Sequence, residues 1–219
     1  MSAPPAPSTS LGDRLRASLA DDVQRSVVVM LAATVLVALA FATGLGQRAS
    51  QHGAHAADGS GAVSHAAAVR SEATFLAAMV PHHEEAVTSA EAILAVSERA
   101  EVRALAADIV EAQSAEIEQL RAWLARWYPQ QGSVDYEPMM RPFVGLRPTE
   151  ADQVFVADMI HHHEGAIEMA QAYLALRGAK RPEVEALADE IVRVQRAEIA
   201  ALQLMLRMWG VAEPDHGGH

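Results

Sequence analysis

One motif occurs twice in the chain: Phe75-Leu-Ala-Ala-Met79-Val-Pro-His82-His83-Glu84-Glu85-Ala86-Val87 and, 80 residues later, Phe155-Val-Ala-Asp-Met159-Ile-His-His162-His163-Glu164-Gly165-Ala166-Ile167. A second motif follows each copy, from Glu101 to Trp127 and, 82 residues later, from Glu183 to Trp209. Such internal repeats indicate a structural unit that is used twice. The change in spacing places a two-residue insertion inside the unit, so each unit is predicted to be two segments joined by a short turn.

Both segments of each unit have the period of an amphipathic helix. At about 100° per residue, apolar residues of the first segment share one stripe: Phe75, Leu76, Met79, Ala86, Ala90, Ile93 and Leu94. The matching stripe of the second segment consists of Leu105, Ile109, Leu120, Trp123, Leu124 and Trp127. Gly178 and Pro182 suit the end of the third helix and the first turn of the fourth.

Strand signals are absent from these segments, so the sequence predicts an all-α fold. Two helical hairpins with short turns indicate a four-helix bundle over residues 71–210, with repeats at 71–128 and 149–210. The proline-containing stretch from Tyr128 to Pro148 is then the crossover between the hairpins.

An uncharged run precedes the bundle. Residues 26–47 contain no charged side chain, and they are about as long as the roughly 20 residues that span a bilayer. We predict one transmembrane helix or uncleaved signal here, with residues 1–25 as a disordered cytoplasmic leader. A cleaved signal peptide is the alternative, because Ala40-Phe41-Ala42 has the small-x-small form of a cleavage site. Either reading places the bundle outside the cytoplasm, in a membrane-bound or a secreted protein.

The composition limits the partners and the metal ligands. Lysine and arginine number 17 against 28 acidic residues, a formal charge of -11, so no nucleic-acid partner is expected. The chain has no cysteine, which excludes disulfides and thiolate metal sites.

Residues 48–70 and 211–219 have the Gly, Ala and His content of a flexible linker and tail. His216 and His219 in the tail are predicted to be weak, auxiliary metal sites.

Polar side chains interrupt the apolar stripes at matching places. Relative to Met79, His82 lies about 60° to one side and His83 about 40° to the other, so the three form a tripod on the core face. Met159, His162 and His163 repeat it, whereas His161 is predicted to point away. On the second helix of each unit, an amide and a carboxylate fall on the apolar face: Gln113 with Glu116, and Gln195 with Glu198.

The two polar sets of each hairpin lie at about equal distances from its turn, so they are predicted to meet in one layer across the core. Buried imidazoles and carboxylates are unfavourable unless they are paired or bind a metal. A metal-free His/Glu network is therefore one interpretation, and a metal site is the other. Thioether and imidazole donors favour copper, as Cu(I) or Cu(II), over iron or zinc. The predicted ligands are Met79, His82, His83, Met159, His162 and His163. Glu116 and Glu198 are predicted to be further ligands or to orient the imidazoles.

These motifs resemble the bacterial domain of unknown function 305, a family that is ferritin-like in fold and includes copper-binding extracytoplasmic proteins. The resemblance covers about residues 70–209. It implies copper binding or tolerance rather than catalysis. The family usually has aspartate seven residues before the motif methionine, and this chain has Glu72 and Asp152 at those positions. The family often has methionine at the positions of Leu120 and Leu202. Members of the family also have methionines near the second motif. The corresponding residues here are predicted to be weak, auxiliary metal sites: Met139, Met140 and Met169.

Several roles remain open at this stage. We expect four polar residues to orient the metal ligands without binding the ion themselves: Gln113, Gln195, Glu72 and Asp152. The expected function is copper sequestration or delivery, and the protein is not expected to be an enzyme. A ferritin-like di-iron oxidase is the alternative, although methionine stands where such sites need the Glu of Glu-x-x-His. A metal-free scaffold tethered to the membrane, a homo-oligomer and a copper-handling partner also remain open.

Overall fold

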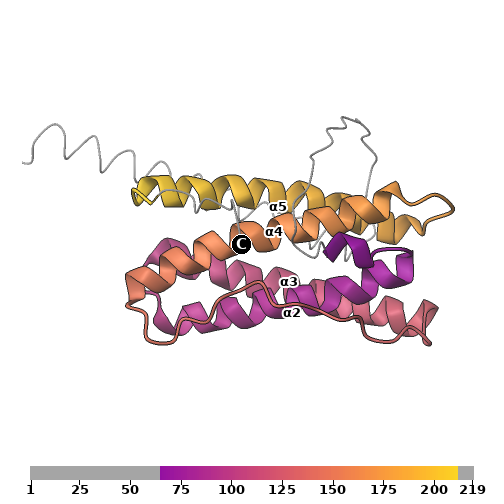
Figure 1. Cartoon of the computed structure of the whole chain (residues 1–219), viewed down its shortest axis with the longest axis horizontal. Coiled ribbons are helices and arrows are strands. Elements are labelled where there is room, and N and C mark those ends of the chain that lie inside the picture. Colours follow the sequence, from indigo (N-terminus) through magenta and orange to yellow (C-terminus); the bar gives the residue numbers. More distant parts are fainter. Residues whose placement is uncertain (1–64, 212–219) are drawn as a thin grey trace, which may run out of the picture.

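The computed structural model describes residues 65–211, which fold into four long helices after one short 3-10 helix (Figure 1). No strand is present in this part of the chain, so the all-α prediction is confirmed. Helices α2 and α3 pack as one hairpin, α4 and α5 as the other, and α2 also packs on α4. The elements are η1 (His65–Ala68), α2 (Glu72–Val96), α3 (Ala100–Trp127), α4 (Pro148–Ala175) and α5 (Pro182–Met208).

Local sequence signals account for where the helices begin. Helix α2 starts at a capping box, in which the Thr74 amide donates to Ser71 Oγ at 3.1 Å and the Ser71 amide donates to Thr74 Oγ1 at 2.9 Å. This arrangement satisfies amides that the first turn of a helix leaves unpaired. Pro182 occupies the first turn of α5, as predicted, because that turn needs no amide hydrogen there. Gly178 lies in the turn between α4 and α5 with a φ of 118°.

Helices α2 and α4 run antiparallel, and two apolar clusters form along them. At one end, Phe75 of α2 stacks on Tyr173 of α4 with ring centroids 4.6 Å apart. Towards the other end, Ala86 and Ile93 of α2 pack with Phe155 of α4. Burying a large apolar side chain contributes about 1.5–3 kcal/mol. The two clusters therefore hold α2 and α4 together on either side of the predicted polar layer.

Glu72 holds one end of the bundle closed. Its carboxylate accepts hydrogen bonds from the hydroxyls of Tyr128 and Tyr173 and from the Arg181 amide, at 2.7 to 2.9 Å. The Arg181 guanidinium also pairs with Glu72 at 2.7 Å and stacks on Trp127. Burial favours a raised pKa for Glu72, but these hydrogen bonds outweigh it and hold the pKa below its ordinary value.

The opposite end repeats this arrangement. Asp152, at the start of α4, pairs with Arg99 in the α2–α3 turn, with Nε 3.2 Å from Oδ2. Arg99 lies over the ring of Trp209, 4.5 Å from its centroid. Glu72 and Asp152 were expected to support metal ligands, and that role stays a prediction. Each joins the start of one hairpin to the turn of the other, and neither contacts a histidine of the polar layer in these pairings.

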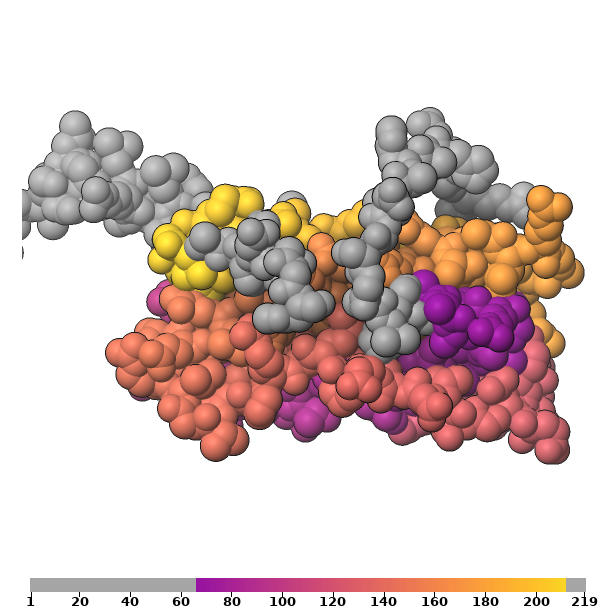
Figure 2. All heavy atoms as spheres, viewed as in Figure 1, coloured from indigo at the N-terminus to yellow at the C-terminus, as the bar shows by residue number. Residues whose placement is uncertain are grey.

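The crossover between the hairpins covers one face of the bundle. It runs beside the α2–α3 hairpin for most of the bundle's length (Figure 1). Its side chains, in salmon tones, spread over the lower part of the face seen in Figure 2. This segment reaches the middle of α2 and α4, which brings residues of the crossover to the level of the repeated motifs.

The other sequence predictions lie partly outside the described residues. Residues 26–47, the leader and the tail with His216 and His219 are outside them. Within residues 65–211, no helix has the continuous apolar character that crossing a membrane requires. The predicted linker of residues 48–70 differs from the structure at its end, because residues 65–68 form η1 and Val69 is buried in the core.

We expect Glu72→Gln to lower the free energy of unfolding by about 1–3 kcal/mol at pH 7, because buried donors lose a charged acceptor. A lowered pKa in the folded state stabilises the fold above the unfolded pKa and loses that effect as the pH falls through the folded pKa. The difference from wild type should therefore shrink in acid. Urea unfolding at several pH values measures it, with Glu91→Gln on the exposed face of α2 as the control. Equal stability of the two variants at pH 7 would contradict the role given to Glu72.

Candidate metal centre

Four histidines lie at the crossing of the two central helices. His82 and His83 come from α2, His162 and His163 come from α4, and each is at most 1% exposed. They occupy the stretch between the two apolar clusters on both helices. The side chain of His161 is 30% exposed and lies 3.0 Å from Glu164, so it points away from the core as predicted.

The central pair is His82 and His162. Their rings stack with centroids 3.8 Å apart and an interplanar angle of 18°. His82 Nε2 donates a hydrogen bond to the backbone carbonyl of His162 at 2.9 Å, since a carbonyl can only accept. This bond selects the tautomer in which His82 Nδ1 carries the lone pair. Nδ1 lies 3.3 Å from the hydroxyl of Tyr136.

The other two histidines, His83 and His163, face the second helix of each hairpin. His83 Nε2 lies 2.6 Å from Oε2 of Glu116 on α3, and His163 Nε2 lies 2.8 Å from Oε2 of Glu198 on α5. These contacts bring the histidines and glutamates to one level, as the distances from the turns predicted. A carboxylate on one ring nitrogen fixes the ring's orientation and raises the basicity of the other nitrogen.

Several buried nitrogens of this layer have no hydrogen-bond partner. They are Nδ1 of His83, Nδ1 of His162 and Nδ1 of His163, while Nε2 of His162 has only a long contact of 3.5 Å with Glu85 Oε2. The side-chain oxygens of Gln113 and Gln195, both buried, are also unpaired. Burial lowers the pKa of His162 to about 4, which outweighs the opposing effect of Glu85, so the ring is neutral at pH 7. Buried polar groups without partners are rare and unfavourable, and neutral imidazole nitrogens are metal donors.

The motif methionines flank the histidine layer. Met79 and Met159 are fully buried, and each belongs to a different apolar cluster, one on either side of the layer. Met169 packs in the cluster of Met79, and the side chain of Met140 packs against the cluster of Met159. Thioether sulfur is thus present on both sides of the four imidazoles.

Glu85, which the sequence analysis did not select, binds the crossover to this layer. Its Oε1 accepts hydrogen bonds from the amides of Met139 and Met140, both at 2.8 Å. The Tyr136 hydroxyl donates to its other oxygen, which also lies 3.5 Å from His162 Nε2. Burial favours a raised pKa for Glu85, but these neighbours outweigh it, so the carboxylate stays ionised.

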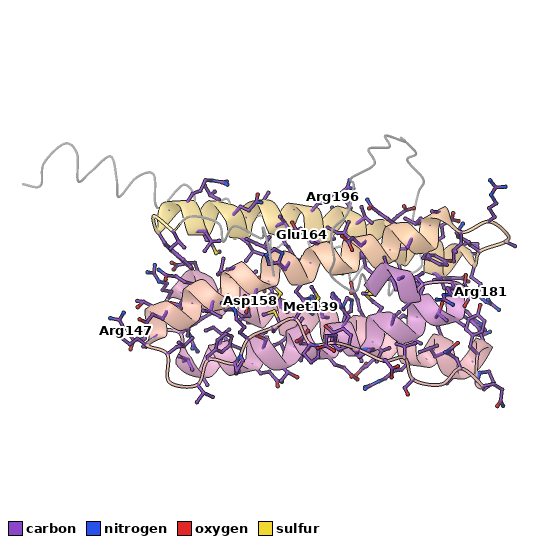
Figure 3. The ribbon with its side chains drawn as sticks, in the orientation of Figure 1. Met139, Arg147, Asp158, Glu164, Arg181 and Arg196 are labelled. Carbon is purple, nitrogen blue, oxygen red and sulfur yellow. The ribbon has the colours of Figure 1, made fainter. Side chains whose placement is uncertain are left out.

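A second carboxylate and a glycine complete the contact with the crossover. Asp158 of α4 accepts hydrogen bonds from the Arg141 amide at 2.9 Å and from its guanidinium. A Cβ on Gly165 would lie 3.4 Å from Met139 Sδ and 3.3 Å from His82 Cε1. Figure 3 shows Met139 near the middle of the bundle, between α4 and α2, while Arg147 and Arg181 mark opposite ends.

A signal for these residues is present in the sequence. The two copies of the motif agree at most positions, but Ala78 corresponds to Asp158 and Glu85 to Gly165. These differences fall at residues that contact the crossover, because Glu85 and Asp158 bind its backbone and Gly165 lies beside Met139. Sequence reasoning that followed only the shared residues therefore missed them.

The geometry limits how a metal could be held. Within residues 65–211, no three His, Asp or Glu side chains are arranged to hold one ion together. The lone pair of an imidazole lies in the ring plane, so one ion cannot lie in the planes of two stacked rings. An ion that used both His82 and His162 would turn at least one ring, and sulfur would supply further donors.

The family profile of DUF305, a domain of unknown function, matches residues 72–206. The chain belongs to the DUF305 family. The match spans both hairpins, the crossover and all four buried histidines. No curated protein matches the chain.

Solved structures agree with the family membership. CopM in its Cu(I)-bound form is 28% identical, with a TM-score of 0.56, and the match covers 64% of this chain and 97% of CopM. A DUF305 protein from Streptomyces coelicolor is 25% identical, with a TM-score of 0.59, covering 68% of this chain and 98% of that one. A DUF305 fragment from Deinococcus radiodurans is 32% identical, with a TM-score of 0.56, covering 64% and 98%.

Proposed function

We propose that this DUF305 protein binds copper in the histidine layer between α2 and α4. The observation that carries the proposal is the set of buried, unpaired imidazole nitrogens on His83, His162 and His163. A bound cation would give these nitrogens a partner and so offset the unfavourable burial. The neutral state of His162 at pH 7 favours the same role, because a metal then displaces no proton from that ring.

The donor set favours copper over harder ions. Imidazole nitrogen and thioether sulfur surround the layer, and such soft to borderline donors suit Cu(I) and Cu(II) better than magnesium or calcium. In the proposed site His82 and His162 are the central donors, and His83 and His163 are orientated by Glu116 and Glu198. Met79 and Met159 flank them as sulfur donors of the helices.

The comparisons support copper as the ion. CopM, which this chain resembles over both hairpins, has been solved in Cu(I)-bound, Cu(II)-bound and silver-bound forms. Silver is chemically close to Cu(I), so that set of ions is the one expected of soft donors. We propose sequestration or delivery of copper, rather than catalysis, as the role of this chain.

We expect His82→Leu with His162→Leu to weaken Cu(I) binding by about 100-fold or more, since loss of supporting residues alone costs about 10- to 100-fold in other metal sites. Competition with a chromophoric Cu(I) chelator measures the affinity. The matched control is His161→Gln, which removes an imidazole from the same helix but from its outer face.

Circular dichroism of the metal-free double variant shows whether a loss of copper binding is due to unfolding. Replacing buried polar groups by apolar ones is often neutral or stabilising, so the helices should remain. If the His161 variant lost as much copper as the folded double variant, binding would belong to the surface and the proposed site would be wrong.

We further propose that the bundle acts outside the cytoplasm. The uncharged residues 26–47 favour export, and the Streptomyces coelicolor relative is provisionally described as secreted. A reporter enzyme that is active only after export, fused after His219, should be active in cells. Activity of a cytoplasm-specific reporter at the same position would contradict the proposal.

A further inference from the structure

The crossover is fixed to the bundle at residues 139–141 by carboxylates from both central helices. Glu85 of α2 accepts the amides of Met139 and Met140, and Asp158 of α4 binds the amide and guanidinium of Arg141. The two carboxylate side chains are only 14% and 8% exposed. Hydrogen bonds to charged groups are stronger than those between neutral groups, so these bonds hold residues 139–141 firmly against the bundle.

The side chain that these bonds position is Met139. Its sulfur and His82 Cε1 both lie about a van der Waals contact from the point where a Cβ of residue 165 would be. Glycine inside a helix is less favourable than alanine. At position 165 it leaves the space in which the thioether of the crossover approaches the central imidazoles.

The donor atoms around that space match a soft ion. The bond from His82 Nε2 to the His162 carbonyl leaves the lone pair on Nδ1, which lies 3.3 Å from the Tyr136 hydroxyl. Nδ1 of His162 has no hydrogen-bond partner. Both oxygens of Glu85 already accept hydrogen bonds from the crossover. The thioether of Met139 and the ring of His82 line this space, and the ring of His162 stacks on that of His82. One thioether and two imidazoles are thus gathered here, a set that favours monovalent Cu(I) or Ag(I).

We propose that Met139, delivered by the crossover, is the sulfur ligand that joins His82 and His162 in a soft-metal site, and that Glu85, Asp158 and Gly165 position it. The inference rests on the proposed function and deepens it, because it names the ligand that gives preference for a monovalent ion. The two copies of the motif then supply one imidazole each. The crossover occurs once in the chain, so it supplies a sulfur ligand on one side of the imidazole pair only.

The test uses the full chain and Ag(I) as the probe. Met139→Leu preserves size while removing sulfur, and it should weaken Ag(I) binding by about 10-fold or more. Met208→Leu is the control, because this side chain is 50% exposed at the end of α5 and belongs to none of the predicted metal sites. Gly165→Ala should weaken binding as well, whereas Gly132→Ala, where no atom lies within 4 Å of the added carbon, should not.

A direct readout accompanies the affinities. In protein with 13C-labelled methionine methyl groups, Ag(I) should shift the Met139 signal. Glu85→Ala should speed hydrogen exchange at the Met139 and Met140 amides and weaken Ag(I) binding, while Glu84→Ala, at the neighbouring exposed ion pair with Arg121, should do neither.

The outcomes separate this inference from the proposed function. Equal Ag(I) affinities of the Met139 and Met208 variants, with a wild type that binds Ag(I), would overturn the role of Met139 and leave copper binding by the histidines standing. An unshifted Met139 signal at saturation would do the same. A wild type that binds copper but no Ag(I) would overturn this inference alone, and one that binds neither ion would overturn both proposals.

Discussion

The burial of four imidazole rings between two antiparallel helices is the constraint around which this bundle is organised. Apolar clusters hold α2 and α4 together on both sides of the rings, and carboxylates from α3 and α5 reach His83 and His163. A polar layer in a core is tolerated only when its groups are paired. The hairpins supply part of that pairing, and the unpaired nitrogens are what a soft cation would satisfy.

The fold is a repeated unit whose symmetry is broken where the crossover binds the bundle. Glu72 with Arg181 and Asp152 with Arg99 are equivalent pairs, and they close the two ends of the bundle in the same way. The symmetry fails at Glu85 and Gly165, where the crossover lies against one face only. Function in such a scaffold comes from the site and its departures from the repeat rather than from the fold.

Periodicity and the repeat predicted the four helices, their short turns and the inward direction of the histidines, because these depend on local spacing along a helix. The same spacing could not reveal that Glu72 contacts Arg181, since that pair joins residues of different hairpins. Nor could helical periodicity place the crossover, because this segment has no repeating pattern of apolar residues. Its position depends on Glu85 and Asp158, and only the mismatches of these two residues with Gly165 and Ala78 signalled them.

X-ray absorption at the copper edge, on the full chain loaded with one equivalent of Cu(I), tests the central claim most directly, because it reports the atoms bound to the ion. The account predicts imidazole nitrogen together with sulfur around a single class of copper, and loss of the imidazole pattern when His82 and His162 are replaced. A spectrum with oxygen ligands and no imidazole or sulfur, or one that the double replacement leaves unchanged, would contradict it.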